Sequence, residues 1–395
     1  MKFSKKEIAI IGTLSLLTAL EALSIDLYLP AFDAIAADLK TGTGNVQISL
    51  SVFIGGFALG QLLWGSLSDK YGRKKPLVAG IILFIIASFA ISMVHSIEML
   101  WFYRFIQAFS GSAGVVISRA IVTDIFPKEK TIDVFTILNM LMGVVPIIAP
   151  VLGNLILKVG HWHYLFFVIA AIGLIALALV LLFVPKAVNT SETSLNIIDK
   201  PTEKIPFYRF FQNREFLIYT LIGSLSYSSL MIYISNSPFL FITTAGFNGF
   251  QYGLLFAVNS IGLIGSSYLV NVLVKRFKLN IILKYVAILQ TIFATLIILF
   301  TITNFALIPI LVFLFLYLMG VGIFLPSTIE LALAEYRKNS GTASSLFGFV
   351  QLAIAFFLSS VVSVLQQNSV IPMVVGLFLC AFLSMFFSMS NKANH

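Results

Sequence analysis

Long apolar stretches separated by short polar segments make up most of this chain. Each stretch is about 20 residues long, which is the length that a helix needs to cross a bilayer. We expect transmembrane helices over residues 7–29, 46–68, 76–94, 98–122, 132–156, 164–184, 215–241, 251–274, 280–301, 305–330, 341–365 and 370–389. The pattern therefore predicts an all-α membrane protein with twelve transmembrane helices.

A single long polar segment, residues 186–214, separates the sixth apolar stretch from the seventh. We expect it to be a cytoplasmic linker between an N-terminal six-helix half, 1–185, and a C-terminal six-helix half, 215–395. The halves show a faint repeat, because Pro30 in LYLPAF matches Pro238 in SNSPFLF. The same offset carries residues 65–75 onto 273–283, which keep the basic character but lack the acidic residue and the glycines.

Composition excludes a soluble protein. The chain is 59% hydrophobic and only 10% charged, with a mean hydropathy of +1.01. So few charged residues cannot form the water-exposed surface of a soluble protein of this size. Cys380 is the only cysteine, so no disulfide forms within the chain. The basic start MKFSKK leads directly into a long apolar stretch, and we expect no cleavable signal.

The basic residues are placed asymmetrically. With the N-terminus in the cytoplasm, Lys40 and Lys158 fall outside, Arg104 and Arg119 lie within apolar stretches, and every other Lys and Arg falls inside. This distribution places both termini in the cytoplasm. It also explains the net charge of +9 without a nucleic-acid partner.

Residues 60–76 read GQLLWGSLSDKYGRKKP and end the second apolar stretch with a run of charges. Gly65 has no side chain, so a neighbouring helix can approach its backbone closely. Asp69 can cap a helix or pair at the membrane edge, and Gly72 permits a tight reversal with positive φ. We expect Gly65, Asp69, Gly72 and Arg73 to act together, whereas the lysines are typical topology signals.

This loop resembles the signature of the major facilitator superfamily, G-x-L-[AS]-D-[RK]-x-G-[RK]-[RK]. The matching residues are Gly65, Leu67, Ser68, Asp69, Lys70, Gly72, Arg73 and Lys74. The resemblance implies two related six-helix halves, a substrate site between them near the membrane midplane, and transport by alternating access. It also implies a gating or conformational role for Gly65, Asp69, Gly72 and Arg73.

Two carboxyl groups lie within the first apolar stretch, in LEALSIDLYLP. Asp26 lies deep in the span, and Pro30 after it removes a backbone hydrogen bond and lets the helix bend. A carboxyl group in a low-dielectric cavity can hold a proton near neutral pH and release it when wetted. We therefore favour Asp26 as a proton carrier over a structural hydrogen bond. Glu21, five residues earlier, points about 140° away, and for it both interpretations stay open.

The fourth apolar stretch contains Arg104 three residues before Gln107, so both lie on one helix face. Charges inside a membrane are costly and are usually paired or functional. We expect Arg104 to be the partner of a carboxylate from another span. Arg119 and Asp124, near the cytoplasmic end, are interpreted as a gate or structural pair that contacts the Asp69 loop.

The fifth apolar stretch contains MGVVPIIAPVLGN, with Gly143, Pro146, Pro150 and Gly153. Two prolines predict a kinked helix, and the flanking glycines allow tight packing against a neighbour. We favour helix packing over direct chemistry here. Such a helix can still serve as a conformational element that flexes or seals against leaks.

Several segments are similar to the bicyclomycin-resistance-type branch of drug:proton antiporters. They are SIDLYLPAF, RFIQAFSGSAGVVISRAIVTDIF, GVVPIIAPVLG and GTASSLFGFVQ, and the likeness is densest over residues 20–155. The resemblance implies that Asp26 is the acidic residue of the first span, Arg104 the arginine of the fourth, and 143–153 the antiporter signature. That signature ends in Gly153–Asn154 here rather than in two glycines, and Glu21 does not map onto a known position of that branch, so the substrate stays open.

Polar and aromatic side chains at suitable depths are candidates for a substrate cavity. They are Tyr28, Gln107, Tyr233, Asn236, Phe239, Asn259 and Gln351. With 38 phenylalanines in the chain, most aromatic side chains must face lipid or pack. We see no nucleotide loop, catalytic triad or metal motif, and we expect no enzyme activity, cofactor or metal.

The sequence predicts a transporter that exports small amphipathic compounds, as in multidrug or antibiotic efflux, in exchange for protons. The expected partners are the substrate, protons and the lipid bilayer, with no nucleic acid, and we expect a monomer in a bacterial inner membrane. An alternative is a proton-coupled exporter of an endogenous metabolite such as a siderophore or an amino acid. A non-transporting sensor is disfavoured because no soluble domain stands beside the spans.

Overall fold

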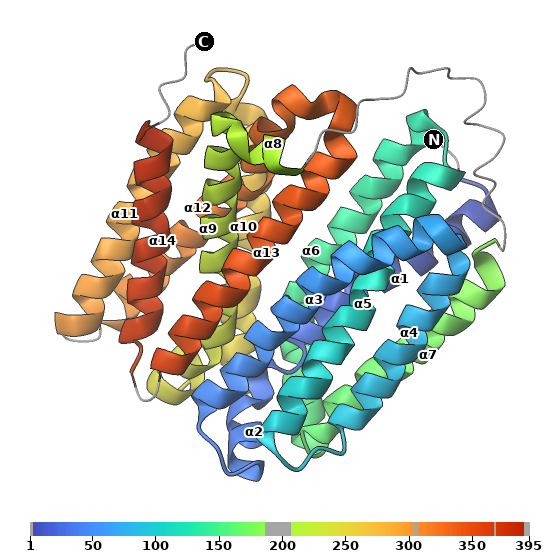
Figure 1. The fold of residues 1–395 in the computed structure, drawn as a ribbon. Coiled ribbons are helices and arrows are strands. Elements are labelled where there is room, and N and C mark those ends of the chain that lie inside the picture. Colours follow the sequence, from blue (N-terminus) through green and yellow to red (C-terminus); the bar gives the residue numbers. More distant parts are fainter. Residues whose placement is uncertain (1–2, 186–206, 304–305, 367–368, 391–395) are drawn as a thin grey trace. The chain divides into compact units, whose positions relative to one another are not determined.

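The computed structural model describes residues 3–185, 207–303, 306–366 and 369–390, and these are almost entirely helical (Figure 1). Eleven helices in these ranges are long and apolar enough to cross a membrane, and a further helix, α6, contains the apolar run Val144–Val159. Each of the twelve predicted stretches thus corresponds to one long helix. The expected all-α membrane fold is confirmed.

The chain divides into two units, each with its own packed helices. Unit 1 comprises Met1–Thr41 and Val52–Lys200, and unit 2 comprises Gly42–Ser51 and Pro201–His395. Helix α3 begins in the segment that groups with unit 2 and continues in unit 1.

The first group of helices runs from blue to green in Figure 1. In chain order it contains α1 (Lys5–Asp26), the short helix η1 (Leu29–Ala31), α2 (Phe32–Asp38), α3 (Thr43–Tyr71), α4 (Lys74–Ile91), α5 (Ile97–Ile125), α6 (Lys128–Val159) and α7 (His163–Phe183). Helix α6 continues through Pro146 and Pro150 as one element.

The second group of helices runs from green to red in Figure 1. It contains α8 (Phe207–Gln212), α9 (Arg214–Pro238), the π-helical turn η2 (Phe239–Thr244), α10 (Gly249–Leu273), α11 (Leu279–Thr303), α12 (Leu307–Leu333), the short helix η3 (Ala334–Asn339), α13 (Ser340–Leu365) and α14 (Ile371–Ser390). Of the expected linker 186–214, residues 186–206 lie outside the described ranges, and its last residues form α8 and the start of α9.

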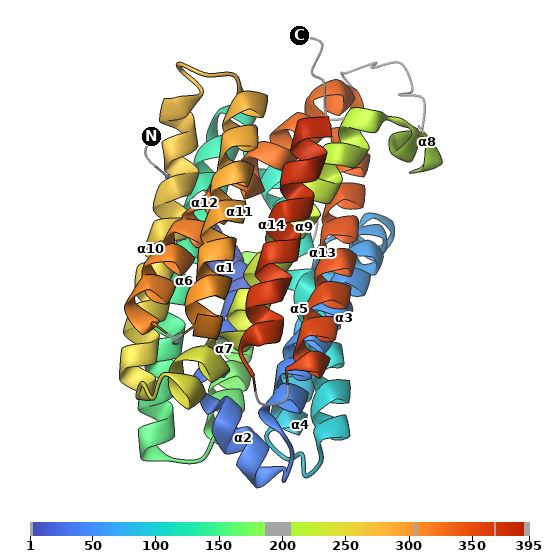
Figure 2. The ribbon, with the colours of Figure 1, turned by 90° about the vertical axis from the view of Figure 1, so that its left-hand side faces the viewer.

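The two groups repeat one packing scheme. Helix α1 packs against α5, α6 and α7, and α4 packs against α5 and α7. In the second group α9 packs against α12, α13 and α14, and α11 packs against α12 and α14, which lie side by side with it in Figure 2. The scheme matches when α1 is paired with α9 and α4 with α11, so the faint sequence repeat corresponds to a structural one.

Local signals explain where several helices begin. Ser4 caps α1 and forms a reciprocal capping box with Glu7, and Asn248 does the same for α10 with Gln251. These side chains satisfy backbone N–H groups that have no partner inside the helix. Because such caps are polar, they lie beyond the apolar stretch and lengthen each helix past the purely apolar segment.

Helix α2 is fixed at its end by the loop before α7. The indole Nε1 of Trp162 donates a hydrogen bond to Asp38 Oδ2 at 2.9 Å, and the Trp162 side chain is buried. This hydrogen bond anchors the segment after Asp26 to the start of α7, and α2 lies at the lower end of the view in Figure 1.

Candidate functional site

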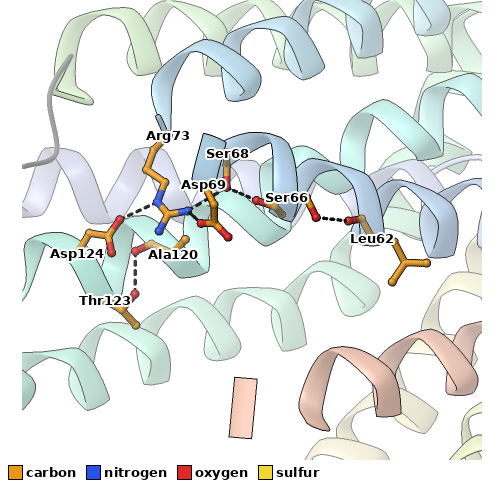
Figure 3. A network of polar contacts seen from close by, with 9 residues as sticks. Leu62, Ser66, Ser68, Asp69, Arg73, Ala120, Thr123 and Asp124 are labelled. Atoms are coloured by element: carbon orange, nitrogen blue, oxygen red, sulfur yellow. Dashed lines mark hydrogen bonds and ion pairs between the residues drawn. The ribbon is translucent and has the colours of Figure 1, made fainter. Parts of the chain in front are cut away.

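Arg73 lies at the centre of a polar network where α3 ends and α4 begins (Figure 3). Its Nε donates to Asp124 Oδ2 of α5 at 2.7 Å, and its Nη1 donates to Ser68 Oγ at 3.0 Å and to Asp69 Oδ1. The Arg73 and Asp124 side chains are 15% and 19% exposed, whereas that of Asp69 is 71% exposed. Arg73 thus ties two helices together, mainly through Asp124.

The backbone and the charges of this loop suit that role. Gly72 has a φ of +80°, which confirms the predicted reversal. Burial lowers the pKa of Arg73, whereas its hydrogen bonds to Asp124 and Asp69 raise the pKa by more than burial lowers it. The pKa therefore lies above its ordinary value. The guanidinium therefore stays charged, and the network depends on the two carboxylates.

Two features differ from the sequence prediction. Asp124 contacts the Asp69 loop, as expected, but its partner there is Arg73 and not Arg119. A methyl group at Gly65 would make only an ordinary contact with Val116, at 3.6 Å. The close approach of α3 to α5 occurs instead at Gly56 and Gly60, where an added Cβ would lie 2.4 Å from a backbone oxygen of α5.

Lys74 does more than mark topology. Its Nζ donates to the backbone oxygens of Leu181 and Val184, at 3.0 and 2.6 Å. These carbonyls belong to the end of α7, where the last C=O groups have no partner within the helix. Lys74 therefore caps α7 from α4. The sequence contains no signal for this contact, because Lys74 and the end of α7 lie far apart in the chain.

Arg104 is completely buried in α5, among aromatic rings. Its Cζ lies 4.3 Å from the ring centres of both Tyr28 and Phe53, and 5.8 Å from that of Phe166. Its Nη1 donates to Ser24 O at 2.9 Å and to Gln107 Oε1 at 2.6 Å. Aromatic faces stabilise a desolvated cation by about 2 kcal/mol or more.

These contacts differ from the expected ion pair. In the described part of the chain, neither Asp26 nor Glu21 pairs with Arg104. Arg104 Nε and Nη2 are buried without a hydrogen-bond partner. Gln107, which accepts from Arg104, donates to Ser88 Oγ at 2.8 Å. Tyr28 and Gln107, predicted as cavity residues, are therefore buried around Arg104.

The two carboxyl groups of α1 lie in different surroundings. Asp26 ends the helix and is 3% exposed, whereas Glu21 is half-buried. They are close enough to repel each other when both are charged. Arg119, which is exposed, attracts Glu21. Within the described ranges, no ion pair joins Arg119 to Glu21, Asp26 or Asp124.

The proline- and glycine-rich part of α6 packs against α1 and η1. A Cβ at Gly153 would lie 2.0 Å from the carbonyl oxygen of Leu27, so only glycine fits there. Pro150 is buried and Pro146 is partly buried. The surroundings of Gly143 lie outside the described residues. This stretch thus holds α6 against the residue that follows Asp26.

A groove of about 360 Å³ separates α1 from α6. Helix α1 contributes Gly12, Ser15, Leu16, Ala19 and Leu23. Helix α6 contributes Val144, Val145 and Ile148. Its volume is in the range of pockets that bind small organic molecules. The sequence prediction missed this groove, because the apolar residues that line it look like any other membrane-facing side chains.

The candidate substrate residues of unit 2 are mostly buried. Asn259 Nδ2 donates to Tyr233 Oη at 2.9 Å, and Asn236 Nδ2 donates to its own helix at Ile232 O. Phe239 begins η2 and is 8% exposed. Gln351, which is partly exposed, donates to Gly223 O at 3.2 Å. The structure joins Tyr233 with Asn259, and the prediction that these residues bind substrate stays untested.

Comparisons with known proteins agree on one family. The model of the Major Facilitator Superfamily matches residues 14–360. A bicyclomycin resistance protein homolog of Haemophilus influenzae is 29% identical over 387 residues, which cover 97% of this chain and 96% of that protein. The multidrug resistance protein MdtL of Escherichia coli O45:K1 is 33% identical over 236 residues, 60% of this chain and 59% of that protein.

Solved structures show the same fold at low identity. A D-xylose-proton symporter covers 96% of both chains with a TM-score of 0.78 and 15% identity. A bacterial homolog of the human lysosomal transporter Spinster, in an inward-facing and occupied conformation, has a TM-score of 0.73 and 15% identity, and covers 98% of this chain and 96% of that one.

Proposed function

Since the chain belongs to the Major Facilitator Superfamily, we propose that it exports small amphipathic compounds in exchange for protons by alternating access. The family resemblance predicted from residues 65–74 is confirmed, and so is the likeness to bicyclomycin resistance proteins. The chain is a multi-pass membrane protein of a transporter family.

The proposed direction of transport rests on the relatives. Two of them are named for resistance to bicyclomycin and to multiple drugs, and resistance by a transporter requires that the compound leave the cell. The structural neighbour that is a symporter shares only the fold, so it carries no weight for direction. Export from the cytoplasm is therefore the direction that we propose here.

The proposed proton carrier is Asp26, and its burial is the observation that carries this assignment. A carboxylate that is 3% exposed loses most of its hydration, and a buried charge needs a partner. No ion pair to Asp26 occurs within the described ranges. In the inward-facing state, Asp26 would release its proton when the substrate binds. In the outward-facing state, Asp26 would regain a proton and the substrate would leave.

Glu21 lies on the same helix as Asp26, and Arg119 lies on α5. Arg119 attracts Glu21, and Glu21 repels Asp26 when both are ionised. We propose that Glu21 and Arg119 influence when the proton is released, and that Asp26 is the group that takes it up and releases it. Arg104, held by Tyr28 and Phe53, fixes α5 against the end of α1.

The Arg73 network is the proposed conformational element. It joins the end of α3 to α5 through Asp124 and to α4 through the loop itself. We propose that residues 1–185 and 215–395 move as two halves, and that this network keeps the ends of α3, α4 and α5 together during the motion. Gly153 holds α6 against Leu27 and is the proposed seal beside Asp26.

The proposed location is a bacterial inner membrane with both termini in the cytoplasm. The support is the distribution of Lys and Arg, nearly all of which fall on the side of the N-terminus. We propose that the protein works as a monomer, because each chain of this fold contains both halves between which alternating access occurs.

Proton release from purified protein tests this function. Lipophilic cations such as ethidium and neutral drugs such as chloramphenicol are added to the protein in weakly buffered detergent, and the pH is recorded. We expect a stoichiometric release with at least one compound, and none from Asp26→Asn. A wild-type protein that binds a compound, seen by equilibrium dialysis, without any release would contradict proton exchange.

A further inference from the structure

The residues of α1 that line the groove toward α6 form a continuous stripe. Gly12, Ser15, Ala19 and Leu23 are spaced by three or four residues, so they lie on one face of the helix. The next position of this stripe is Asp26, one turn beyond Leu23. The groove therefore runs along α1 toward the carboxyl group that we assign to proton exchange.

Ser15 is an unusual member of this stripe. Its side chain is 3% exposed, and its Oγ has no hydrogen-bond partner. Most buried serines of the membrane helices described here bond to a carbonyl one turn earlier, as Ser24 does with Leu20 O at 2.7 Å. A buried hydroxyl without a partner costs free energy. Ser15 has the one side-chain hydroxyl among the residues that line the groove, and that hydroxyl has no partner that a bound acceptor would have to displace.

The remaining lining is apolar and uncharged. Leu16, Ala19 and Leu23 form one wall, and Val144, Val145 and Ile148 form the other. Such walls favour an apolar ligand in proportion to the area that it buries. They disfavour sugars, amino acids and other polar metabolites, whose many polar groups would lose their hydration against a single hydroxyl.

From this lining we infer that the α1–α6 groove is a substrate subsite for lipophilic compounds that carry at least one hydrogen-bond acceptor, to which Ser15 donates. The inference rests on the proposed export function and names its substrate class. A compound in the groove would lie on the same face of α1 as Asp26, so binding and proton exchange share one helix face. The same chemistry argues against the export of an endogenous polar metabolite.

Benzophenone provides a direct probe of this subsite. It is lipophilic, has one carbonyl acceptor, and on irradiation attaches to nearby C–H bonds. Diphenylmethane has the same two rings without the acceptor and serves as competitor. In the purified wild-type protein we expect the label on peptides of 5–26 or 144–159. We expect unlabelled benzophenone to compete for these positions about fivefold better than diphenylmethane, which corresponds to one hydrogen bond.

Two glycine variants separate groove filling from general damage. Gly12 lines the groove, and no atom lies within 4 Å of a Cβ placed there. Gly265 of α10 has equally open surroundings and lies outside the groove. We expect Gly12→Leu to reduce labelling of the groove peptides at least fivefold, and Gly265→Leu to leave it unchanged. Equal labelling in the two variants would overturn the inference.

The variant Ser15→Ala separates a ligand contact from a structural one. Removing a buried hydroxyl without a partner should leave the melting temperature of the ligand-free protein unchanged or raised. The competition advantage of benzophenone over diphenylmethane should fall from about fivefold to none. If the advantage persists in Ser15→Ala, or if diphenylmethane equals benzophenone in the wild type, the groove is a seam for acyl chains and the inference is wrong.

The groove and the export function fail in different ways. Labelling of the groove without proton-driven efflux of any compound would refute the proposed function and leave the subsite standing. If the wild type exports a compound and Gly12→Leu exports it as well as Gly265→Leu does, the subsite is refuted and the proposed function stands.

Discussion

Replacement of Asp124 by Asn should destabilise the protein more than replacement of Asp69. The sequence motif draws attention to Asp69, but its side chain is 71% exposed, and exposed ion pairs contribute at most about 1 kcal/mol. Asp124 is 19% exposed and accepts from Arg73 at 2.7 Å. Loss of a partly buried charged hydrogen bond costs about 1.5–3 kcal/mol. We therefore expect Asp124→Asn to cost at least about 0.5 kcal/mol more than Asp69→Asn.

The assay is denaturant-induced unfolding of the purified protein in mild detergent, followed by helical circular dichroism. Asp133→Asn is the matched control, because Asp133 is an exposed carboxylate on α6, and we expect it to change stability by less than about 0.5 kcal/mol. In an Arg73→Met background the cost of Asp124→Asn should shrink, since the partner is already gone. Equal costs for Asp69→Asn and Asp124→Asn, or a cost of Asp124→Asn that Arg73→Met leaves unchanged, would refute this reasoning.

Further predictions concern transport and packing. Asp69→Asn and Gly72→Leu should both abolish efflux while expression persists, since Gly72 has a φ of +80° that side chains rarely adopt; normal efflux from cells would contradict this. Arg104→Lys should lose exchange in vesicles, because an ammonium cannot bond Ser24 O and Gln107 Oε1 while it stacks between two rings; full activity would show that a point charge suffices. Gly153→Ala should lower stability in the same unfolding assay by about 1–3 kcal/mol, because its Cβ would meet the Leu27 carbonyl, and unchanged stability would contradict the close contact.

Hydrophobic length predicted the helices well and their ends less well. The stretch 46–68 corresponds to α3, which spans Thr43–Tyr71, and 132–156 corresponds to α6, which spans Lys128–Val159. Most of the extra residues are polar, and polar residues can continue a helix without extending the apolar pattern. The short helices α2 and α8 were not predicted, because seven or six residues are too few to show a helical period.

The candidate site was predictable where one motif holds its parts and not where distant helices meet. Residues 65–74 indicated a structured loop, and Gly72 and Arg73 behave as expected. The aromatic rings around Arg104 come from α3, from α7 and from Tyr28, which lies between α1 and η1. Nothing in a sequence with 38 phenylalanines selects Phe53 and Phe166 from the rest. For the same reason, the sequence does not show that Lys74 caps α7.

Uptake by inverted vesicles tests most directly whether Asp26 couples transport to protons. Ethidium or another compound that the wild type exports is supplied outside the vesicles, and a pH gradient is imposed with the interior acid. Wild type, Asp26→Asn and Glu21→Gln are compared at equal protein levels, with binding of the same compound measured in each. Asn keeps the size and polarity of Asp but cannot take up a proton.

We predict that Asp26→Asn still binds the compound but no longer concentrates it, whereas downhill exchange can continue. Glu21→Gln should concentrate it, with altered pH dependence. If Asp26→Asn accumulates the compound like the wild type and Glu21→Gln does not, Glu21 is the coupling group. If both variants concentrate the compound normally, proton coupling through α1 is contradicted.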